Sequence, residues 1–110
     1  MAKSVEELAK IKSELEAVHK PLYTVEIPTD EDEMETRTIY LKKFDRTILS
    51  AVQKMAQGND ELKAVEVFIK NTYVGGDDIN EILNDLYMLR SLQSVVVEMV
   101  SVKKAKISKN

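Results

Sequence analysis

Few side chains in this 110-residue chain have types and spacing suited to chemistry. His19 is the only histidine, and it stands just before Pro21 at the end of a segment with helical spacing. A histidine at that place is more typical of a favourable charge at the negative end of a helix dipole than of a general base. No spacing supports a Ser-His-Asp set around it, and the chain has no cysteine nucleophile. The sequence therefore predicts a protein that is not an enzyme.

An acidic run is the second candidate site. Asp30, Glu31, Asp32, Glu33 and Glu35 lie within six positions, and several carboxylate oxygens can hold Ca²⁺ or Mg²⁺. The run lacks the glycine at the sixth loop position and the closing glutamate of an EF-hand. The pattern favours a solvated loop, whose function, if it has one, is an electrostatic contact with a basic partner. Cation binding by this loop, in a small enzyme or metal protein, is kept as an alternative.

The third candidate is Gly75-Gly76-Asp77-Asp78, which precedes a predicted helix. Backbone amides at a helix N-terminus can bind phosphate. No lysine and serine or threonine complete a P-loop here, and two aspartates repel an anion. The pattern favours a helix that ends at the glycines and another that begins at Asp77 or Asp78.

Composition narrows the classes of function. A net charge of −3 and an aromatic content of 5% argue against a nucleic-acid binder, which needs clustered basic and stacking side chains. The apolar runs span only a few residues, far fewer than the roughly 20 of a membrane span. The charged N-terminus lacks the apolar region of a signal peptide. We therefore expect one cytoplasmic domain over residues 1–110, with no cofactor and no nucleic-acid or membrane partner.

The first part of the chain is predicted to be a helical arm followed by a β-hairpin. Ser4 and Glu7 have the spacing of a capping box, and apolar residues then recur every three or four positions, which predicts an arm over residues 1–20. Alternating side chains predict a hairpin over residues 22–43. Its antiparallel strands are expected at Leu22–Ile27 and Thr36–Lys42. Two strands alone are marginal, so helices must pack on them.

Residues 45–104 are predicted to form three helices. Asp45 caps the first, and Asn59 or Asp60 caps the second after a linker so short that the two should meet at a sharp angle. The third begins near Ile79 and is the longest. The fold class is therefore α+β: an N-terminal helix, a β-hairpin, then three helices with a long C-terminal helix.

The last helix carries two apolar stripes, which implies two packing surfaces in the core or at a subunit interface. The second stripe consists of Met88, Leu92, Val95, Met99 and Val102. The β-branched residues within 95–102 leave a strand open as the alternative to a helix there. The basic tail over residues 105–110 is expected to fray.

One set of residues resembles a pattern known from other proteins. The set is Tyr40-Leu41-Lys42-Lys43, Asp45-Arg46, Leu49, Ala51, Glu66, Ile69, Asn71, Tyr73 and Gly75-Gly76-Asp77. With it, the chain resembles small phage and prophage proteins of the tail assembly chaperone family from about Val25 to the last helix. The resemblance implies architectural roles only: Tyr73 packs, Gly75 and Gly76 turn the chain, and Asp77 caps a helix.

The resemblance also implies a function. It is that of a non-catalytic chaperone, which binds the helical tape measure protein while a phage tail polymerises around it and is then released. The second stripe of the last helix would be the partner-binding surface, since adaptable methionines suit amphipathic helices. The alternative is a structural or regulatory homo-oligomer assembled through the C-terminal helix. Whether the N-terminal helix packs on its own domain is left open.

Overall fold

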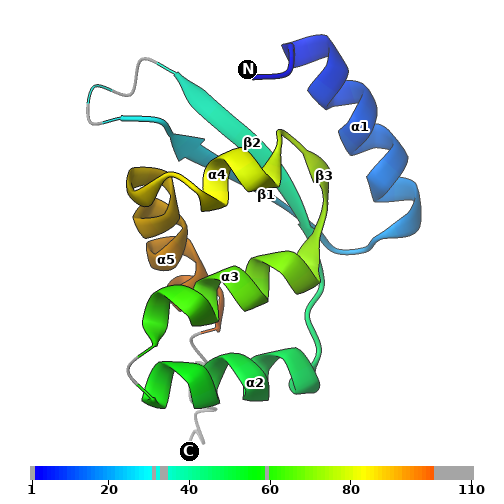
Figure 1. Ribbon diagram of the computed structural model, residues 1–110. Coiled ribbons are helices and arrows are strands. Elements are labelled where there is room, and N and C mark those ends of the chain that lie inside the picture. Colours follow the sequence, from blue (N-terminus) through cyan, green and yellow to red (C-terminus); the bar gives the residue numbers. More distant parts are fainter. Residues whose placement is uncertain (1, 31, 33–34, 59, 101–110) are drawn as a thin grey trace, which may run out of the picture.

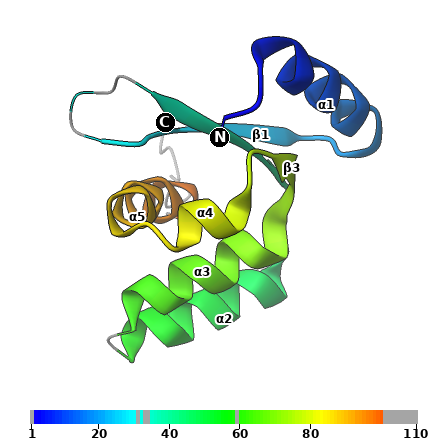
Figure 2. The same cartoon turned by 45° about the horizontal axis from the view of Figure 1, so that its top comes forward.

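The fold places a small β-sheet between an N-terminal helix and the remaining helices. The computed structural model describes residues 2–30, 32, 35–58 and 60–100. Its elements in chain order are α1 (Val5–Val18), β1 (Leu22–Pro28), β2 (Thr36–Lys42), α2 (Arg46–Gln57), α3 (Glu61–Thr72), β3 (Tyr73–Gly76), α4 (Ile79–Leu83) and α5 (Leu86–Val100). Figures 1 and 2 show α1 on one side of the sheet and the other helices on the opposite side. The predicted α+β class is confirmed.

The predicted hairpin is present. β1 and β2 pair antiparallel over their whole length, with Val25 opposite Ile39. Side chains alternate along a strand, so every second one faces the helical layer. The buried apolar side chains on that face are Val25, Ile27, Ile39 and Leu41. Their burial explains why the alternating pattern was a reliable signal for this register.

The structure adds a strand that the sequence pattern does not predict. β3 pairs antiparallel with β2, with Gly76 opposite Ile39. The prediction that Gly75 and Gly76 end a helix in a turn is therefore wrong, since α3 ends at Thr72 and both glycines lie in the sheet. Gly76 is needed there because its φ is +113° and a Cβ would lie 2.5 Å from the carbonyl oxygen of Thr38.

The helical layer differs from the prediction in two respects. α2 and α3 lie side by side and antiparallel, not at a sharp angle (Figures 1 and 2). The single long last helix is divided, because two aspartates act as separate N-caps. Asp78 accepts from the Asn80 N–H at 2.9 Å at the start of α4, and Asp85 accepts from the Met88 N–H at 3.0 Å at the start of α5. The run of β-branched residues is helical as far as Val100.

Several predictions concern residues outside the described part of the chain. They are the last position of the apolar stripe, Val102, the tail over residues 105–110, the acidic residues Glu31 and Glu33, and Asn59 as a helix cap.

The core lies between the helical face of the sheet and helices α3, α4 and α5. Phe68 and Leu92 are fully buried in it, and the Phe68 ring meets Phe44 edge to face with centroids 5.1 Å apart. One charged side chain, Arg37, is also buried there, and its Nη2 lies 3.1 Å from Oε1 of Glu81 in α4. A buried guanidinium needs such a partner, so this pair fixes α4 against β2.

The resemblance implied that Asp77 caps a helix, but in the structure it does not. Asp78 caps α4, while the Asp77 side chain is 1% exposed and lies between segments distant in the sequence. Its Oδ2 accepts from the Thr38 N–H in β2 at 2.7 Å, and its Oδ1 accepts from the Lys3 N–H at 2.6 Å. The hydroxyl of Tyr73, which packs against the core, donates to the Asp77 carbonyl oxygen at 2.9 Å. Asp77 therefore joins the start of α1 to the sheet.

Helix α1 packs on its own domain, but lightly. Its N-cap Ser4 accepts from the Glu7 N–H at 3.1 Å, as the capping box predicts. Its carbonyl at Leu8 accepts from the Tyr40 hydroxyl at 3.2 Å, and its apolar face lies over Gly75. None of its residues is buried. Such a helix depends on few contacts, so it should open more readily than the core.

We expect Asp77→Ala to lower the free energy of unfolding by about 2 kcal/mol, because it leaves the part-buried Thr38 N–H without its acceptor. It should also raise hydrogen exchange throughout α1, since the Lys3 contact is lost. Asp78→Ala is the matched control: it removes only the α4 cap, costs about 1 kcal/mol and leaves exchange in α1 unchanged. Urea unfolding and amide exchange measure both effects. Equal exchange in α1 for the two variants would contradict this role of Asp77.

Alkaline pH should destabilise the fold through its tyrosines. Burial, and then the Asp77 charge, raise the pKa of Tyr40 above its ordinary value of 10.0, and burial with the Asp78 and Asp77 charges raises the pKa of Tyr73. A raised folded-state pKa adds stability that is complete below the unfolded value and is lost as pH rises through the folded value. The melting temperature should therefore fall above about pH 10.

Tyr40→Phe should make that fall less steep, at the cost of about 1 kcal/mol at neutral pH for the hydrogen bond to Leu8. Tyr23→Phe, at a tyrosine that is 37% exposed, is the control and should leave the slope near that of the wild type. Thermal melts at a series of pH values test this. A slope unchanged by Tyr40→Phe would show that Tyr40 contributes nothing to it.

Candidate protein-binding site

The predicted partner-binding stripe is mostly core. Met88 and Leu92 are 3% and 0% exposed, so they offer no surface to a partner. Val95 and Met99 are half-buried and pack against the same core. The stripe faces the protein's own interior because the division at Asp85 turns α5 beneath the sheet, where it contacts β1 and α3. As an exposed binding surface, the predicted stripe is therefore wrong at Met88 and Leu92.

An apolar groove lies instead between α2, α3 and α5. We call it the valine groove, and its volume is about 160 Å³. Its apolar lining consists of Val52, Ala64, Val65, Val96 and Val97. The first four of these are buried and form its floor, while Val97 is 57% exposed at its mouth. Short side chains on three converging helices leave a space that longer ones would fill.

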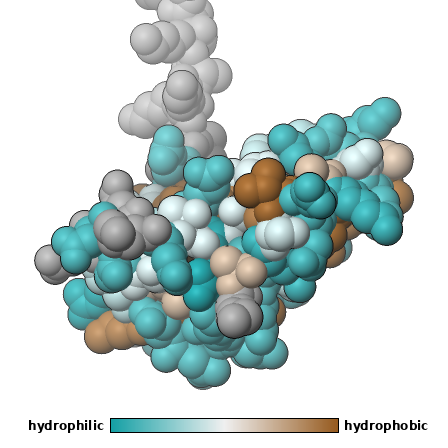
Figure 3. Space-filling view, turned by 90° about the horizontal axis from the view of Figure 1, so that it is seen from above, coloured by the Kyte–Doolittle hydropathy of each residue, from teal (hydrophilic) through white to brown (hydrophobic). Residues whose placement is uncertain are grey.

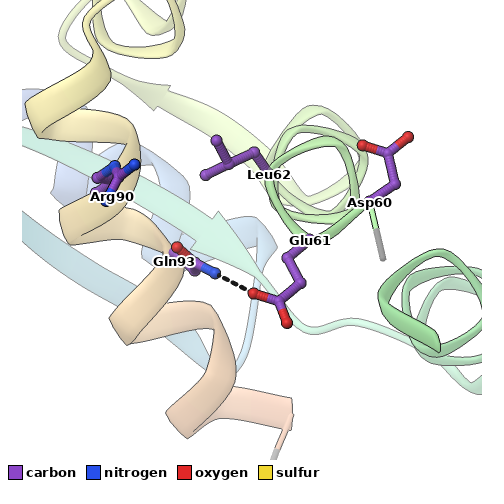
Figure 4. Close-up of a pocket in the computed structure, with 5 residues that line it drawn as sticks. All are labelled: Asp60, Glu61, Leu62, Arg90 and Gln93. Atoms are coloured by element: carbon purple, nitrogen blue, oxygen red, sulfur yellow. Dashed lines mark hydrogen bonds between the residues drawn. The ribbon is translucent and has the colours of Figure 1, made fainter. Parts of the chain in front are cut away.

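The rim of the valine groove is polar. Glu61 of α3 and Gln93 of α5 line it, and the Gln93 Nε2 donates to the Glu61 Oε2 at 2.9 Å. Figure 4 shows Glu61 reaching across from α3 to Gln93. This hydrogen bond is exposed, so it ties the two helices together at the surface without closing the groove.

A polar pocket of about 400 Å³ lies on the other side of this bridge. Its lining residues are Asp60, Glu61, Leu62, Arg90 and Gln93, drawn in Figure 4. The pocket shares Glu61 and Gln93 with the valine groove. An apolar slot beside a polar pocket carrying charges of both signs matches the pattern of a protein interface, in which an apolar centre is bordered by a polar rim.

The other candidate residues that the structure describes do not form one site. The backbone N–H of His19 donates to the Leu15 carbonyl oxygen at 2.8 Å. His19 therefore lies at the C-terminus of α1, the position that the sequence predicts for it. In the acidic loop, Asp30 accepts from the Asp32 N–H at 3.1 Å, and Glu35 lies 3.5 Å from Arg37. Within the residues the structure describes, no three His, Cys, Asp or Glu side chains are grouped as a metal site.

The sequence pattern does not predict the valine groove, and the reason is physical. Val52, Val65 and Val96 stand at apolar helical positions, and such positions predict burial without saying how well the neighbours fill the space. The one local signal is Ala64, a small residue inside an apolar face. Whether a small residue leaves a groove depends on the helices packed opposite, which periodicity does not determine.

The face seen from above in Figure 3 is different in character. It is largely hydrophilic, and its hydrophobic residues stand in separate small groups.

None of the described helices combines the length and the apolar character that crossing a membrane requires. Comparisons of the chain with protein-family models, with curated proteins and with solved structures find no match.

Proposed function

We propose that the protein is a non-catalytic protein-binding domain that receives apolar side chains of a partner helix in the valine groove. Following the resemblance of its sequence, the partner is the helical tape measure protein of a phage tail, and the protein is a cytoplasmic tail assembly chaperone. The observation that carries the binding role is the groove itself, an apolar slot open between three helices. The identity of the partner rests on the resemblance alone.

The groove suits an amphipathic helix. Helices dock into grooves through apolar residues spaced three or four apart, and the slot has room for an aliphatic side chain. Polar residues on the flank of the docked helix would meet Arg90, Asp60 and the Glu61–Gln93 bridge. A small slot gives modest affinity, because few apolar atoms are removed from water. Modest affinity favours release once the tail has assembled.

A second candidate function is a structural or regulatory homo-oligomer assembled through the C-terminal helix. It is favoured by the large apolar side chains that α5 exposes at its start, Leu86 at 58% and Tyr87 at 38%. In that case self-association would cover these residues, and a partner from another protein would not be needed.

We expect Val97→Lys to weaken binding of a tape measure helix by about tenfold or more, since one apolar contact of the groove is replaced by a charge. Leu86→Lys is the matched control, because Leu86 is 58% exposed on the same helix but lies outside the groove. It should change the affinity less than twofold. The helix is first identified by cross-linked pull-down from cells that express the tail genes, and affinities are then measured by calorimetry.

The outcomes separate the two functions. Recovery of a large helical tail protein whose binding is lost with Val97→Lys supports the chaperone. Recovery of only the protein itself, with a molar mass in light scattering that falls with Leu86→Lys, supports the homo-oligomer and excludes the chaperone.

A further inference from the structure

The sheet has an open edge at β1. Among the residues that the structure describes, the strand order is β1-β2-β3, so there β1 pairs on one side only. In an antiparallel ladder, alternate residues direct both backbone groups to the partner strand and the residues between them direct theirs away. The phase is set by the Thr29 N–H, which donates to the Glu35 carbonyl oxygen at 3.0 Å. Because the alternation has a period of two, the backbone N–H and C=O groups of Val25 also point to β2. The backbone groups of Thr24 and Glu26 point to the open edge.

The opposite side of β2 confirms this phase. Thr38 lies across from Glu26, and its carbonyl oxygen accepts from the Asp77 N–H at 2.8 Å. Thr38 therefore directs its backbone groups to β3, away from β1, as the alternation requires. Within the described part of the chain, the backbone groups of Thr24 and Glu26 that face the edge have no backbone partner.

The usual protection of an edge strand is sparse at β1. Natural edge strands carry lysines, central prolines, bulges or a covering element. β1 has no lysine or arginine, its only proline is at its last position, and its pairing with β2 has no bulge. Thr24 and Glu26 are exposed, and so is Tyr23, at 37%. The strand presents seven residues on which another strand can be added.

We propose that β1 is the dimerisation edge of this protein, which pairs antiparallel with β1 of a second copy about a two-fold axis at Val25. In this register Thr24 lies opposite Glu26 of the second copy, and Tyr23 lies opposite Ile27. The residues that face the edge then exchange N–H···O=C bonds across it. The two sheets become one continuous sheet, with α5 of each copy beneath β1.

Self-complementarity is the argument for a second copy as the occupant. A two-fold pairing requires each strand to match its own sequence reversed. About Val25, apolar residues meet apolar ones on the helical face, and a neutral threonine meets a glutamate on the other face. Pro28 falls opposite Leu22, where its missing N–H costs only a terminal bond.

Neighbouring registers fit less well. If one β1 strand slides by two residues along the other so that the two-fold axis moves to Glu26, then Glu26 lies opposite Glu26 of the second copy, which is a like-charge pair. If it slides by two residues the other way, Pro28 lies beyond the paired region and the ladder is shorter. The register about Val25 uses the whole strand without either fault. This inference does not depend on the proposed function, since the valine groove lies between α2, α3 and α5.

The test is the molar mass of the full chain in sedimentation and light scattering over a series of concentrations. The wild type should reach the mass of a dimer. Thr24→Pro should remain monomeric, because it removes an N–H that faces the edge and no bond to β2. Thr24→Ala, which keeps that N–H, is the matched control and should still dimerise.

A charge pair tests the register without a proline. Thr24→Glu places like charges opposite each other at both symmetric positions and should weaken dimerisation by about tenfold. Thr24→Lys places a lysine opposite Glu26 and should strengthen it by a similar factor. In the wild type, the Thr24 and Glu26 amides should also become protected from hydrogen exchange as the concentration rises.

Three results would overturn the proposal. They are a wild type that stays monomeric at all concentrations, a dimer that Thr24→Glu and Thr24→Lys affect equally, and a dimer whose mass falls with Leu86→Lys instead. The last of these would place the interface on α5.

Discussion

A carboxylate shared by two backbone amides joins the parts of this fold. The chain leaves β3 at Gly76 to begin α4, so the Asp77 carbonyl cannot complete the ladder with Thr38 and accepts from Tyr73 instead. The Asp77 side chain takes its place as the acceptor for the Thr38 N–H, and its other oxygen holds Lys3 before α1. Buried amides need partners, so this one residue lets the sheet end and α1 dock at the same point.

The two sides of the sheet consequently differ in strength. The helical side buries a continuous core from β1 to α5, whereas α1 on the other side buries none of its residues. Stability should therefore reside in the sheet and the helical layer, with α1 as a unit that opens on its own. Both surfaces suited to partners, the valine groove and the β1 edge, belong to the stable part. Opening of α1 leaves the groove intact.

Local signals accounted for most of the fold. The Ser4 cap, the alternation in β1 and β2, and the start of α2 after Asp45 all depend on neighbours in sequence, and the structure has them. The division at Asp85 also had a local signal, an aspartate before an apolar residue, but the apolar spacing continues across it and outweighed the cap.

What local signals missed depends on distant contacts. A four-residue strand with two glycines has little strand propensity, and β3 forms because β2 offers it unpaired backbone groups. The valine groove likewise depends on how three helices fit together. Apolar spacing predicted that Met88 and Leu92 must be buried against another surface. It did not show that this surface is the protein's own sheet and not a partner.

The contact between Lys3 and Asp77 also orders events during synthesis. The two residues are separated by 74 positions, so α1 leaves the ribosome long before its anchor exists. At about 5–20 residues per second the delay is roughly 4–15 s. During that time α1 lacks both the Asp77 acceptor and β3, the strand that its apolar face covers, while its Glu and Lys face keeps it in water. The first helix made is therefore anchored only after the third strand of the sheet has been made.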